Sequence, residues 1–221
     1  MQMIRRRRGA ALAALCLAAS TAVAAGIERT PLDRFLDKLT TWQADFVQQL
    51  RDGKGRVQSR AEGRMTVSRP GKFRWELRPA GPGPTQYAQL LLADGRNLWF
   101  YDRDLAQVTV KPAATALASA PAALLAGGSN WRDLFLVRSL PRAADLDWLE
   151  VRPRRANAEF RDLRLGFAGA DLRRMVVRDN LGQIAEIEFR NAQRNPAVPR
   201  ELLEFIPPGG VDVIGAPQPG R

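Results

Sequence analysis

The chain has 221 residues, 45% of them hydrophobic, and a formal net charge of +11, because 34 lysines and arginines outnumber 23 aspartates and glutamates. It contains no histidine, which excludes nucleophiles activated by histidine as well as histidine metal sites. Its carboxylates alternate along the expected strands and no motif gathers them, so we expect no enzyme activity, no metal and no cofactor.

The first 24 residues have the three parts of a secretory signal peptide. Four arginines at positions 5–8 precede an apolar run from Ala10 to Ala19, and small residues surround Ala24. A transmembrane anchor is the alternative, but the apolar run is shorter than the roughly 20 residues needed to cross a bilayer. Acylation of Cys16 would need a small residue before it, and Leu15 stands there. We therefore expect cleavage near Ala24 and export to the periplasm.

The expected mature chain, residues 25–221, has no cysteine and cannot form a disulfide, although its compartment is oxidising. It has 30 basic and 23 acidic residues, a net charge of +7. Such an excess fits nucleic acid, an anionic membrane surface or an acidic protein partner. The basic residues are scattered among acids, without the aromatic and basic clusters of single-strand binders. We therefore expect no nucleic-acid binding and favour a membrane or a protein partner.

A short amphipathic helix is predicted to begin at Pro31. Thr30 is a suitable N-cap, Asp33 lies in the first turn, and one stripe is apolar: Leu32, Phe35, Leu36 and Leu39. From Thr41 the apolar pattern changes to a period of two, which indicates a strand that ends at the turn sequence DGKG. Further strands are predicted at 56–68, 72–79, 86–93, 97–101 and 106–110.

The alanine-rich residues 113–128, here called the lid segment, interrupt the strands. Pro121 and the pair Gly127-Gly128 are typical of a helix start and a helix end, so the segment is predicted to form two short helices that carry Leu117, Leu124 and Leu125. The segment is either a simple connector or a small movable lid. After it, strands are predicted at 134–139, 146–152, 159–166, 172–178, 183–190 and 202–206.

These elements predict a mainly β fold in one domain, residues 25–221, with an antiparallel sheet of mostly sequential hairpins. A sheet of close to a dozen strands must curl, and in an open half-barrel alternate residues of each strand line the concave face. This face is predicted to be apolar and to include Trp42, Phe46, Met65, Val67, Phe73, Trp75 and Leu77, with Leu90 or Leu91 and with Trp99 or Phe100.

A packed core is the simpler interpretation of these residues. However, the predicted helices are few and short, which favours a partly unfilled apolar cavity under a lid. Arg69 shares its strand parity with Met65 and Val67, so it is predicted to face the apolar side, where a guanidinium needs partners. Carbonyls at the ends of the lid helices would satisfy it. In the alternative, Pro70 ends the strand and Arg69 reaches water.

Several motifs of this chain resemble those of the periplasmic outer-membrane lipoprotein carriers of the LolA type. The resemblance runs from about residue 27 to 214. Its most specific part is Arg-Pro-x-x-Phe-x-Trp at 69–75, followed by Asp-Gly-x-x-Leu-Trp-x-Tyr at 94–101. In order along the chain, the similar strings are ADFVQQLRDGKG, EGRMTVSRPGKFRWEL, LLADGRNLWFYDRDLAQVTV, PAALLAGG and FIPPGGVDV.

The resemblance implies a curled open sheet whose apolar cavity holds the acyl chains of a lipoprotein, without cofactor or bond change. Carriers of this type take lipoproteins from an inner-membrane ABC-type exporter and deliver them to an outer-membrane receptor lipoprotein. Carried over to this chain, Arg69 holds the lid helices closed, and Phe73 and Trp75 belong to the cavity and its rim. We place Trp99 in the cavity as well, and expect a monomer.

Three other functions are weighed against the carrier. A receptor of related fold would need an acylatable cysteine after the signal peptide, and the sequence has none there. A periplasmic sensor that binds lipids or lipoproteins would be longer and carry a second domain. An enzyme that acts on lipids would turn over an acylated substrate, and no nucleophile for it is evident. The carrier is therefore the preferred prediction.

Overall fold

The structure is a computed structural model that describes residues 29–82, 86–116, 121–127, 131–155, 158 and 160–219. The predicted signal peptide, residues 1–24, its cleavage site and Leu117 lie outside the described residues. The described helices are α1 (Pro31–Leu36), α2 (Ala113–Ala116), α3 (Pro121–Ala126), α4 (Trp131–Leu134) and the 3-10 helix η2 (Arg200–Leu203). None of the helices in these ranges is long and apolar enough to cross a membrane.

The described residues form twelve strands. In the first half these are β1 (Thr41–Arg51), β2 (Val57–Ser68), β3 (Lys72–Pro79), β4 (Gln89–Asp94), β5 (Asn97–Asp102) and β6 (Gln107–Pro112). The second half contributes β7 (Phe135–Ala143), β8 (Leu146–Pro153), β9 (Phe160–Ala168), β10 (Asp171–Asp179), β11 (Ile184–Arg194) and β12 (Asp212–Ile214).

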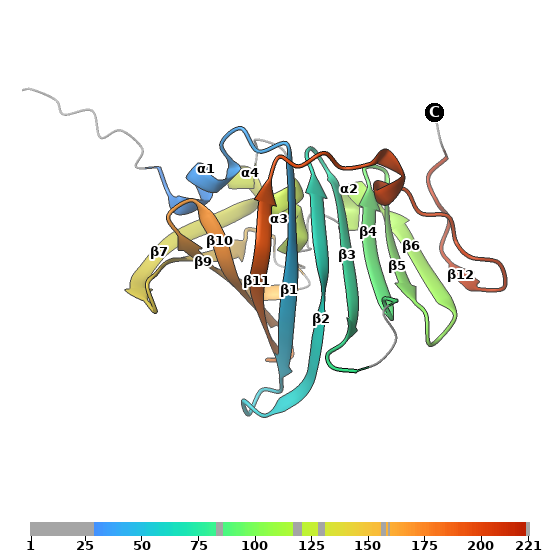
Figure 1. Cartoon of the computed structure of the whole chain (residues 1–221), viewed down its shortest axis with the longest axis horizontal. Coiled ribbons are helices and arrows are strands. Elements are labelled where there is room, and N and C mark those ends of the chain that lie inside the picture. Colours follow the sequence, from blue (N-terminus) through green and yellow to red (C-terminus); the bar gives the residue numbers. More distant parts are fainter. Residues whose placement is uncertain are drawn as a thin grey trace, which may run out of the picture.

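All of these strands belong to one sheet, in the order β12-β6-β5-β4-β3-β2-β1-β11-β10-β9-β8-β7 (Figure 1). Neighbours pair antiparallel, except that β12 lies parallel to β6. β1 pairs with β11, with Phe46 opposite Phe189, and this joins the two halves of the chain. β7 and β12 end the order, so the sheet stays open within the described ranges. The predicted curled, mainly β fold is confirmed.

One predicted strand is wrong. Residues 202–206 do not pair in the sheet: the 3-10 helix η2 ends at Leu203, and the chain continues in extended form. Pro199 precedes this helix and Pro207-Pro208 follow it. Prolines have no N–H to donate to a strand ladder, which explains why the segment crosses the sheet instead of extending it. The short strand β12, which the sequence did not predict, comes after these prolines.

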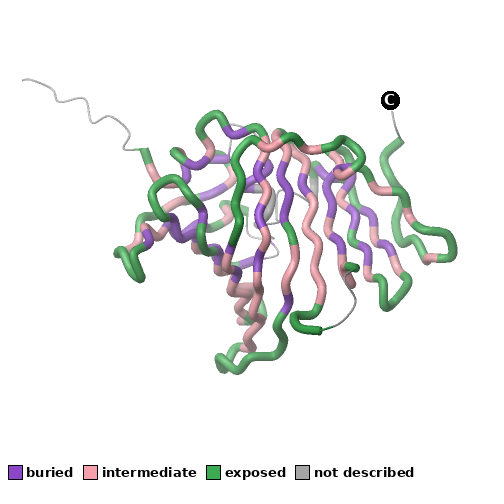
Figure 2. The backbone as a smooth tube through the Cα atoms, in the orientation of Figure 1, coloured by how far each residue is buried: buried purple, intermediate pink, exposed green. Residues whose placement is uncertain are grey.

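The sheet has an apolar core on each face. The main core lies on the concave face and includes Leu32 and Phe35 of α1 and Leu124 and Leu125 of α3. α3 lies behind the central strands in the view of Figure 1. The second core lies on the outer face of β4, β5 and β6, where Phe205 of the C-terminal segment packs against it. Buried and less buried positions alternate along the central strands, as a sheet with distinct faces requires (Figure 2).

Candidate functional site

The concave face brings together most of the predicted apolar site residues. Five of them are at most 1% exposed and belong to the main core: Trp42, Phe46, Met65, Val67 and Phe73. Strand pairing explains the grouping, because Trp42 lies opposite Val67, and Val67 lies opposite Phe73. Directly opposed residues of neighbouring strands project from the same face of a sheet. The period-two pattern of the sequence thus correctly predicts that these side chains share one face of the sheet, and their place in an acyl-chain cavity stays a prediction.

Gly63 leaves room for the aromatic ring of Phe46 to come close to the backbone of β2. Gly63 stands opposite both Phe46 and Leu77 in the sheet. A Cβ atom at position 63 would come within 2.9 Å of the Phe46 ring and within 1.8 Å of the Glu76 carbonyl oxygen. Only glycine fits such a close approach.

A less buried row of apolar side chains continues this face toward β5. Trp75 and Leu77 are partly buried against the main core, and the rings of Phe46 and Trp75 lie 4.8 Å apart. Trp75 pairs with Leu91, and Leu91 pairs with Phe100, which is 40% exposed. The sequence left two choices open for the concave face, Leu90 or Leu91 and Trp99 or Phe100. The pairing shows that Leu91 and Phe100 lie on it. This row presents apolar surface that a ligand could cover.

The predicted place of Trp99 in the concave site is wrong. Trp99 belongs to the second core on the outer face, where its ring lies 5.6 Å from that of Phe205. Its indole N–H donates to the Asp94 carboxylate at 2.8 Å. Leu90 and Leu92 are fully buried in the same core. In β4 and β5, the residues that face outward are therefore apolar as well as those that face inward. The sequence alone could not show which of the two sets lies on the concave face.

The sequence interpretation missed the part of the concave face that strands β8 to β11 form. Strands β8 to β11 contribute buried side chains to the same main core: Leu149, Val151, Leu163, Leu165, Met175, Ile187 and Phe189. The pairing Leu149–Leu165–Met175–Ile187 forms one continuous row across these four strands. Period-two alternation at 146–152 and 183–190 was the available signal. The predicted site residues came only from the first half of the chain.

Helix α3 of the lid segment lies on this face. The side chains of Leu124 and Leu125 are 1% exposed and Ala126 is fully buried, all within the main core. At the end of α3, the Ala126 carbonyl accepts a hydrogen bond of 2.7 Å from the backbone N–H of Gly71. The helix therefore covers the apolar face and contacts the turn at residues 69–71.

Arg69 lies in this turn. Its backbone N–H donates to the Thr40 carbonyl at 2.7 Å, and its Nη1 atom is buried. Burial lowers the pKa of the Arg69 guanidinium from its ordinary value, because the charged form is less well solvated. The turn thus places a partly buried cation next to the end of α3. Its predicted role in holding the lid closed stays a prediction.

The opposite face of the central strands is polar. A groove of about 880 Å³ there is lined by alternating charges, among them Asp45, Arg64, Glu62, Arg78 and Arg190. Ion pairs join Arg64 to Asp45 at 2.8 Å and Arg78 to Glu62 at 2.9 Å. This groove cannot receive an acyl chain without burying these charges. Within the described ranges, no group of three or more potential metal-binding side chains is found.

The sequence of this chain is similar to those of known lipoprotein carrier proteins. The family model described as "Outer membrane lipoprotein carrier protein LolA" matches residues 37–206. An outer-membrane lipoprotein carrier protein of Dechloromonas aromatica is 37% identical over 204 residues, covering 92% of this chain and 95% of the relative. One from Nitrosomonas europaea is 42% identical over 184 residues, covering 83% and 86%.

A solved structure of similar fold is an uncharacterized conserved protein from Thermus thermophilus. It matches with a TM-score of 0.50 and 19% sequence identity, and the match covers 83% of this chain and 96% of that protein. This likeness concerns the fold alone.

Proposed function

Because the chain belongs to the LolA family of outer membrane lipoprotein carrier proteins, we propose that it binds the acyl chains of outer-membrane lipoproteins on its concave face. The observation that carries this proposal is the apolar row of Trp75, Leu77, Leu91 and Phe100, which continues the main core beyond α3. Acyl chains would extend this core and cover its exposed edge.

Helix α3 makes binding reversible because it competes with the acyl chains for the same apolar face. Each acyl methylene removed from water contributes about 0.8 kcal/mol, so an open apolar cavity would hold a single chain reversibly but several chains together very tightly. Leu124 and Leu125 instead cover the same face in the structure described here. Acyl chains must displace them, and the binding free energy becomes the difference between two filled states. Such a carrier can release its ligand.

Membership of this family supports a proposal for the route of transport. The proposed carrier receives lipoproteins from an inner-membrane ABC-type exporter, crosses the periplasm as a monomer and delivers them to an outer-membrane receptor lipoprotein. It breaks and forms no covalent bond. The signal peptide is cleaved near Ala24 before this carrier acts. In the carrier, Arg69 holds the lid segment closed until the ligand is exchanged. The half-buried Arg69 next to the end of α3 supports this assignment.

A release assay tests the proposal. Spheroplasts that carry radiolabelled outer-membrane lipoproteins are incubated with and without the purified mature protein, and label is counted in the soluble fraction. We expect label to be released as an intact one-to-one complex. If a folded protein releases nothing, the carrier function is wrong, and a sensor or a lipid enzyme with another hydrophobic ligand takes its place.

A further inference from the structure

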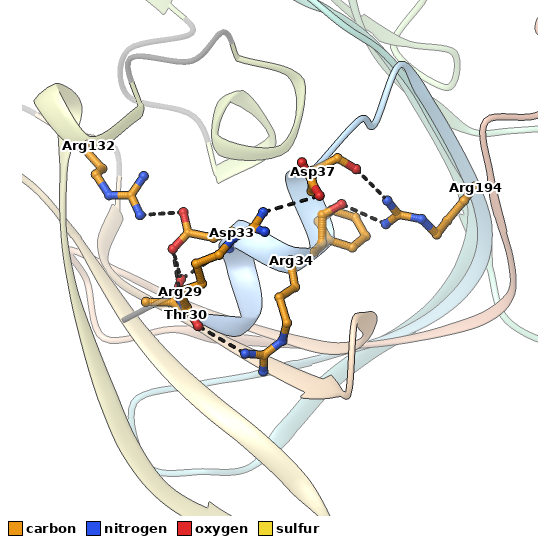
Figure 3. A network of polar contacts seen from close by, with 8 residues as sticks. Arg29, Thr30, Asp33, Arg34, Asp37, Arg132 and Arg194 are labelled. Atoms are coloured by element: carbon orange, nitrogen blue, oxygen red, sulfur yellow. Dashed lines mark hydrogen bonds and ion pairs between the residues drawn. The ribbon is translucent and has the colours of Figure 1, made fainter. Parts of the chain in front are cut away.

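Several arginines near helix α1 are engaged in holding the fold together. Arg132 of α4 forms an ion pair with Asp33 of α1 (Figure 3). Arg194 of β11 donates to the carbonyls of Phe35 at 2.7 Å and of Asp37 at 3.0 Å. A cation suits these carbonyls because they lie at the negative end of the helix dipole. These arginines have their partners within the chain.

The outer face of β7 to β10 carries a different group of arginines. Residues 131–178 contain 11 arginines, no lysine and 7 acidic residues, a net charge of +4 out of the +7 of the expected mature chain. Each strand from β7 to β10 contributes one arginine to an ion pair with one of two carboxylates. We call these six residues the arginine patch: Arg138, Arg152, Arg164 and Arg178 with Glu150 and Asp162.

Strand pairing places the arginine patch on the face opposite the main core. Arg138 lies opposite Glu150, and Glu150 lies opposite Arg164. Asp162 lies opposite Arg178. The residues between these positions contact the main core: Val137, Val151, Leu163 and Val177. Because successive residues of a strand point to opposite faces, the patch lies on the outer surface, away from the proposed ligand.

The two carboxylates lie below the arginines of the patch. The side chains of Glu150 and Asp162 are 6% exposed, while those of Arg138 and Arg152 are 68% and 58% exposed. On the outer face of the central strands, by contrast, the paired Asp45 side chain is 37% exposed. A partner that approaches the central strands therefore meets both signs of charge. One that approaches the patch meets arginines.

The patch holds more positive charge than its carboxylates neutralise. Glu150 accepts hydrogen bonds from Arg138 at 3.0 Å and from Arg152 at 3.2 Å. Burial alone would raise the pKa of Glu150, but the hydrogen bonds and charges of Arg152 and Arg138 outweigh it and lower the pKa. Glu150 is therefore ionised at neutral pH. Four arginines surround two carboxylates, so the formal net charge of the patch is +2.

Arg164 and Arg178 can still donate hydrogen bonds to an external group. The Arg164 Nε and the Arg178 Nη1 each lie 3.8 Å from an Asp162 carboxylate oxygen, which is too far for a hydrogen bond. A guanidinium has five N–H donors in a planar fork that matches a carboxylate. The buried carboxylates thus hold these forks near fixed positions without using all of their donors.

These features favour a protein partner over an anionic membrane. Arginine forks at fixed positions suit carboxylates at fixed positions, whereas lipid headgroups need only a positive charge near the surface. Binding at a membrane interface also draws on apolar side chains that enter the headgroup region. Within the described parts of β7 to β10, Leu136 is the one large apolar side chain that is strongly exposed. The patch therefore lacks the apolar half of such a site.

We propose that the arginine patch is a docking surface for an acidic protein surface, carried by a partner that exchanges lipoproteins with this chain. This inference rests on the proposed carrier function, since that function supplies the partner. Docking through the outer face of β7 to β10 orients the carrier and leaves its concave face free to load and release the ligand.

Two variants of equal charge test the patch. The patch variant, Arg138→Gln with Arg178→Gln, leaves each buried carboxylate with one arginine. The control variant is Arg78→Gln with Arg190→Gln on the central strands, whose side chains are 34% and 57% exposed, against 34% for Arg178 and 68% for Arg138. Both variants lose two positive charges, so an effect of total charge is the same in both.

Stopped-flow fluorescence measures the association of each variant with two purified proteins, the proposed receptor without its lipid anchor and the periplasmic domains of the proposed exporter. At about 50 mM salt, we expect the patch variant to associate at least about fivefold more slowly than the control variant with one of them, and the difference to vanish at about 500 mM. Equal rates of the two variants with both proteins would overturn the proposal.

A charge-preserving variant shows whether the positive charge is the cause. Arg138→Lys with Arg178→Lys should associate within about twofold of the wild-type rate, because long-range attraction depends on charge. It should dissociate faster, because an ammonium group cannot donate to a carboxylate as a fork. If it associates as slowly as the patch variant, the charge of the patch does not direct docking and the proposal is wrong.

Sedimentation with vesicles tests the membrane as the occupant. Vesicles of equal parts phosphatidylethanolamine and phosphatidylglycerol are mixed with each variant at low salt. We expect the patch and control variants to bind them equally, since both have lost the same charge. If the patch variant loses vesicle binding but associates normally with both proteins, the patch binds a membrane and the proposal is overturned.

Ligand loading separates this inference from the carrier function. The probe is a fluorescent peptide with an S-diacylglyceryl cysteine at its N-terminus. We expect the patch variant to load it as the wild type does, which also shows that the variant is folded; loss of loading would contradict the assignment of the patch to docking. If the wild type fails to bind this probe while the two variants still differ in docking, the carrier function is wrong and the docking surface stands.

Discussion

Arg69 is the residue at which closure of the lid segment can be tested most directly. Its partly buried guanidinium belongs to the turn that contacts the end of α3. We expect Arg69→Leu to weaken closure, because the variant loses the donors and the charge that suit helix-terminal carbonyls. The variant should still take up lipoprotein from spheroplasts but pass it on poorly to the receptor.

Arg60→Leu is the matched control for this prediction, since Arg60 is an exposed arginine of β2, the strand that Arg69 follows. Transfer from each loaded variant to membranes that contain the receptor is followed over time. Normal transfer by Arg69→Leu would contradict its role in closure.

The two tryptophans Trp75 and Trp99 lie on opposite faces and should separate binding from stability. Trp75 borders the exposed apolar row of the concave face, and Trp99 is buried in the second core. We expect Trp75→Leu to reduce loading of a diacylated probe. Trp99→Leu should lower the free energy of unfolding by about 1–3 kcal/mol, because it leaves a void and removes one of the hydrogen bonds that Asp94 accepts, yet should load normally. Titration with the probe and urea unfolding measure the two effects. Reduced loading in a folded Trp99→Leu would contradict this assignment.

The pattern of alternate residues along each strand explains why the concave-face residues of β1 to β3 were predicted correctly and Trp99 was not. Along β1 to β3, apolar residues alternate with polar or charged ones, so the sequence alone groups Phe46, Met65 and Phe73 correctly. Along β5, Leu98, Trp99, Phe100 and Tyr101 are all apolar or aromatic. The second core makes this possible, since the C-terminal segment covers the outer face there. A pattern without polar positions carries no information about which side faces inward.

Helix α3 is the element whose packing should set how tightly the ligand is held. In the proposed competition, weaker packing of α3 raises the free energy of the empty state and leaves the lipid-bound state unchanged. Truncation of a fully buried leucine typically costs about 2–5 kcal/mol, and each 1.4 kcal/mol changes an equilibrium constant tenfold. We therefore expect Leu124→Ala to bind a diacylated probe at least about tenfold more tightly. Competition titrations measure this affinity.

A surface substitution outside the lid segment is the control for this prediction. Leu181→Ala removes a leucine that is 86% exposed, so it should alter neither stability nor probe affinity. If Leu124→Ala binds the probe no more tightly than this control, α3 does not compete with the acyl chains.

Most elements were predictable because their local signals agree with the fold. The start of α1 follows from its capping residues, and the structure forms the full capping box between Thr30 and Asp33. The strands follow from period two and from turn sequences such as DGRN. η2 and β12 were not predictable in this way. Their positions depend on the second core, to which Phe205 and Val211 are brought by contacts distant in sequence.

At the scale of the whole molecule, curling follows from the length of the sheet, but the strand order does not. Sequential hairpins account for β1 to β6 and for β7 to β11. The pairing of β1 with β11 joins residues such as Phe46 and Phe189, which lie far apart in the sequence. Nothing local specifies this pairing. It arises because it brings two apolar faces into one core, with Trp42 and Phe189 in ring contact at 5.0 Å.

The excess of positive charge makes a prediction about the whole molecule. With a net charge of +7 in the expected mature chain, attraction to an acidic surface on the proposed receptor should accelerate association, and salt should screen it beyond about 10 Å at 0.1 M. We expect the association rate with the purified receptor to fall on the order of tenfold between about 50 and 500 mM salt, while the dissociation rate changes little. Stopped-flow fluorescence measures both rates. An association rate independent of salt would mean that apolar contacts at the mouth, and not the charge of the carrier, direct docking.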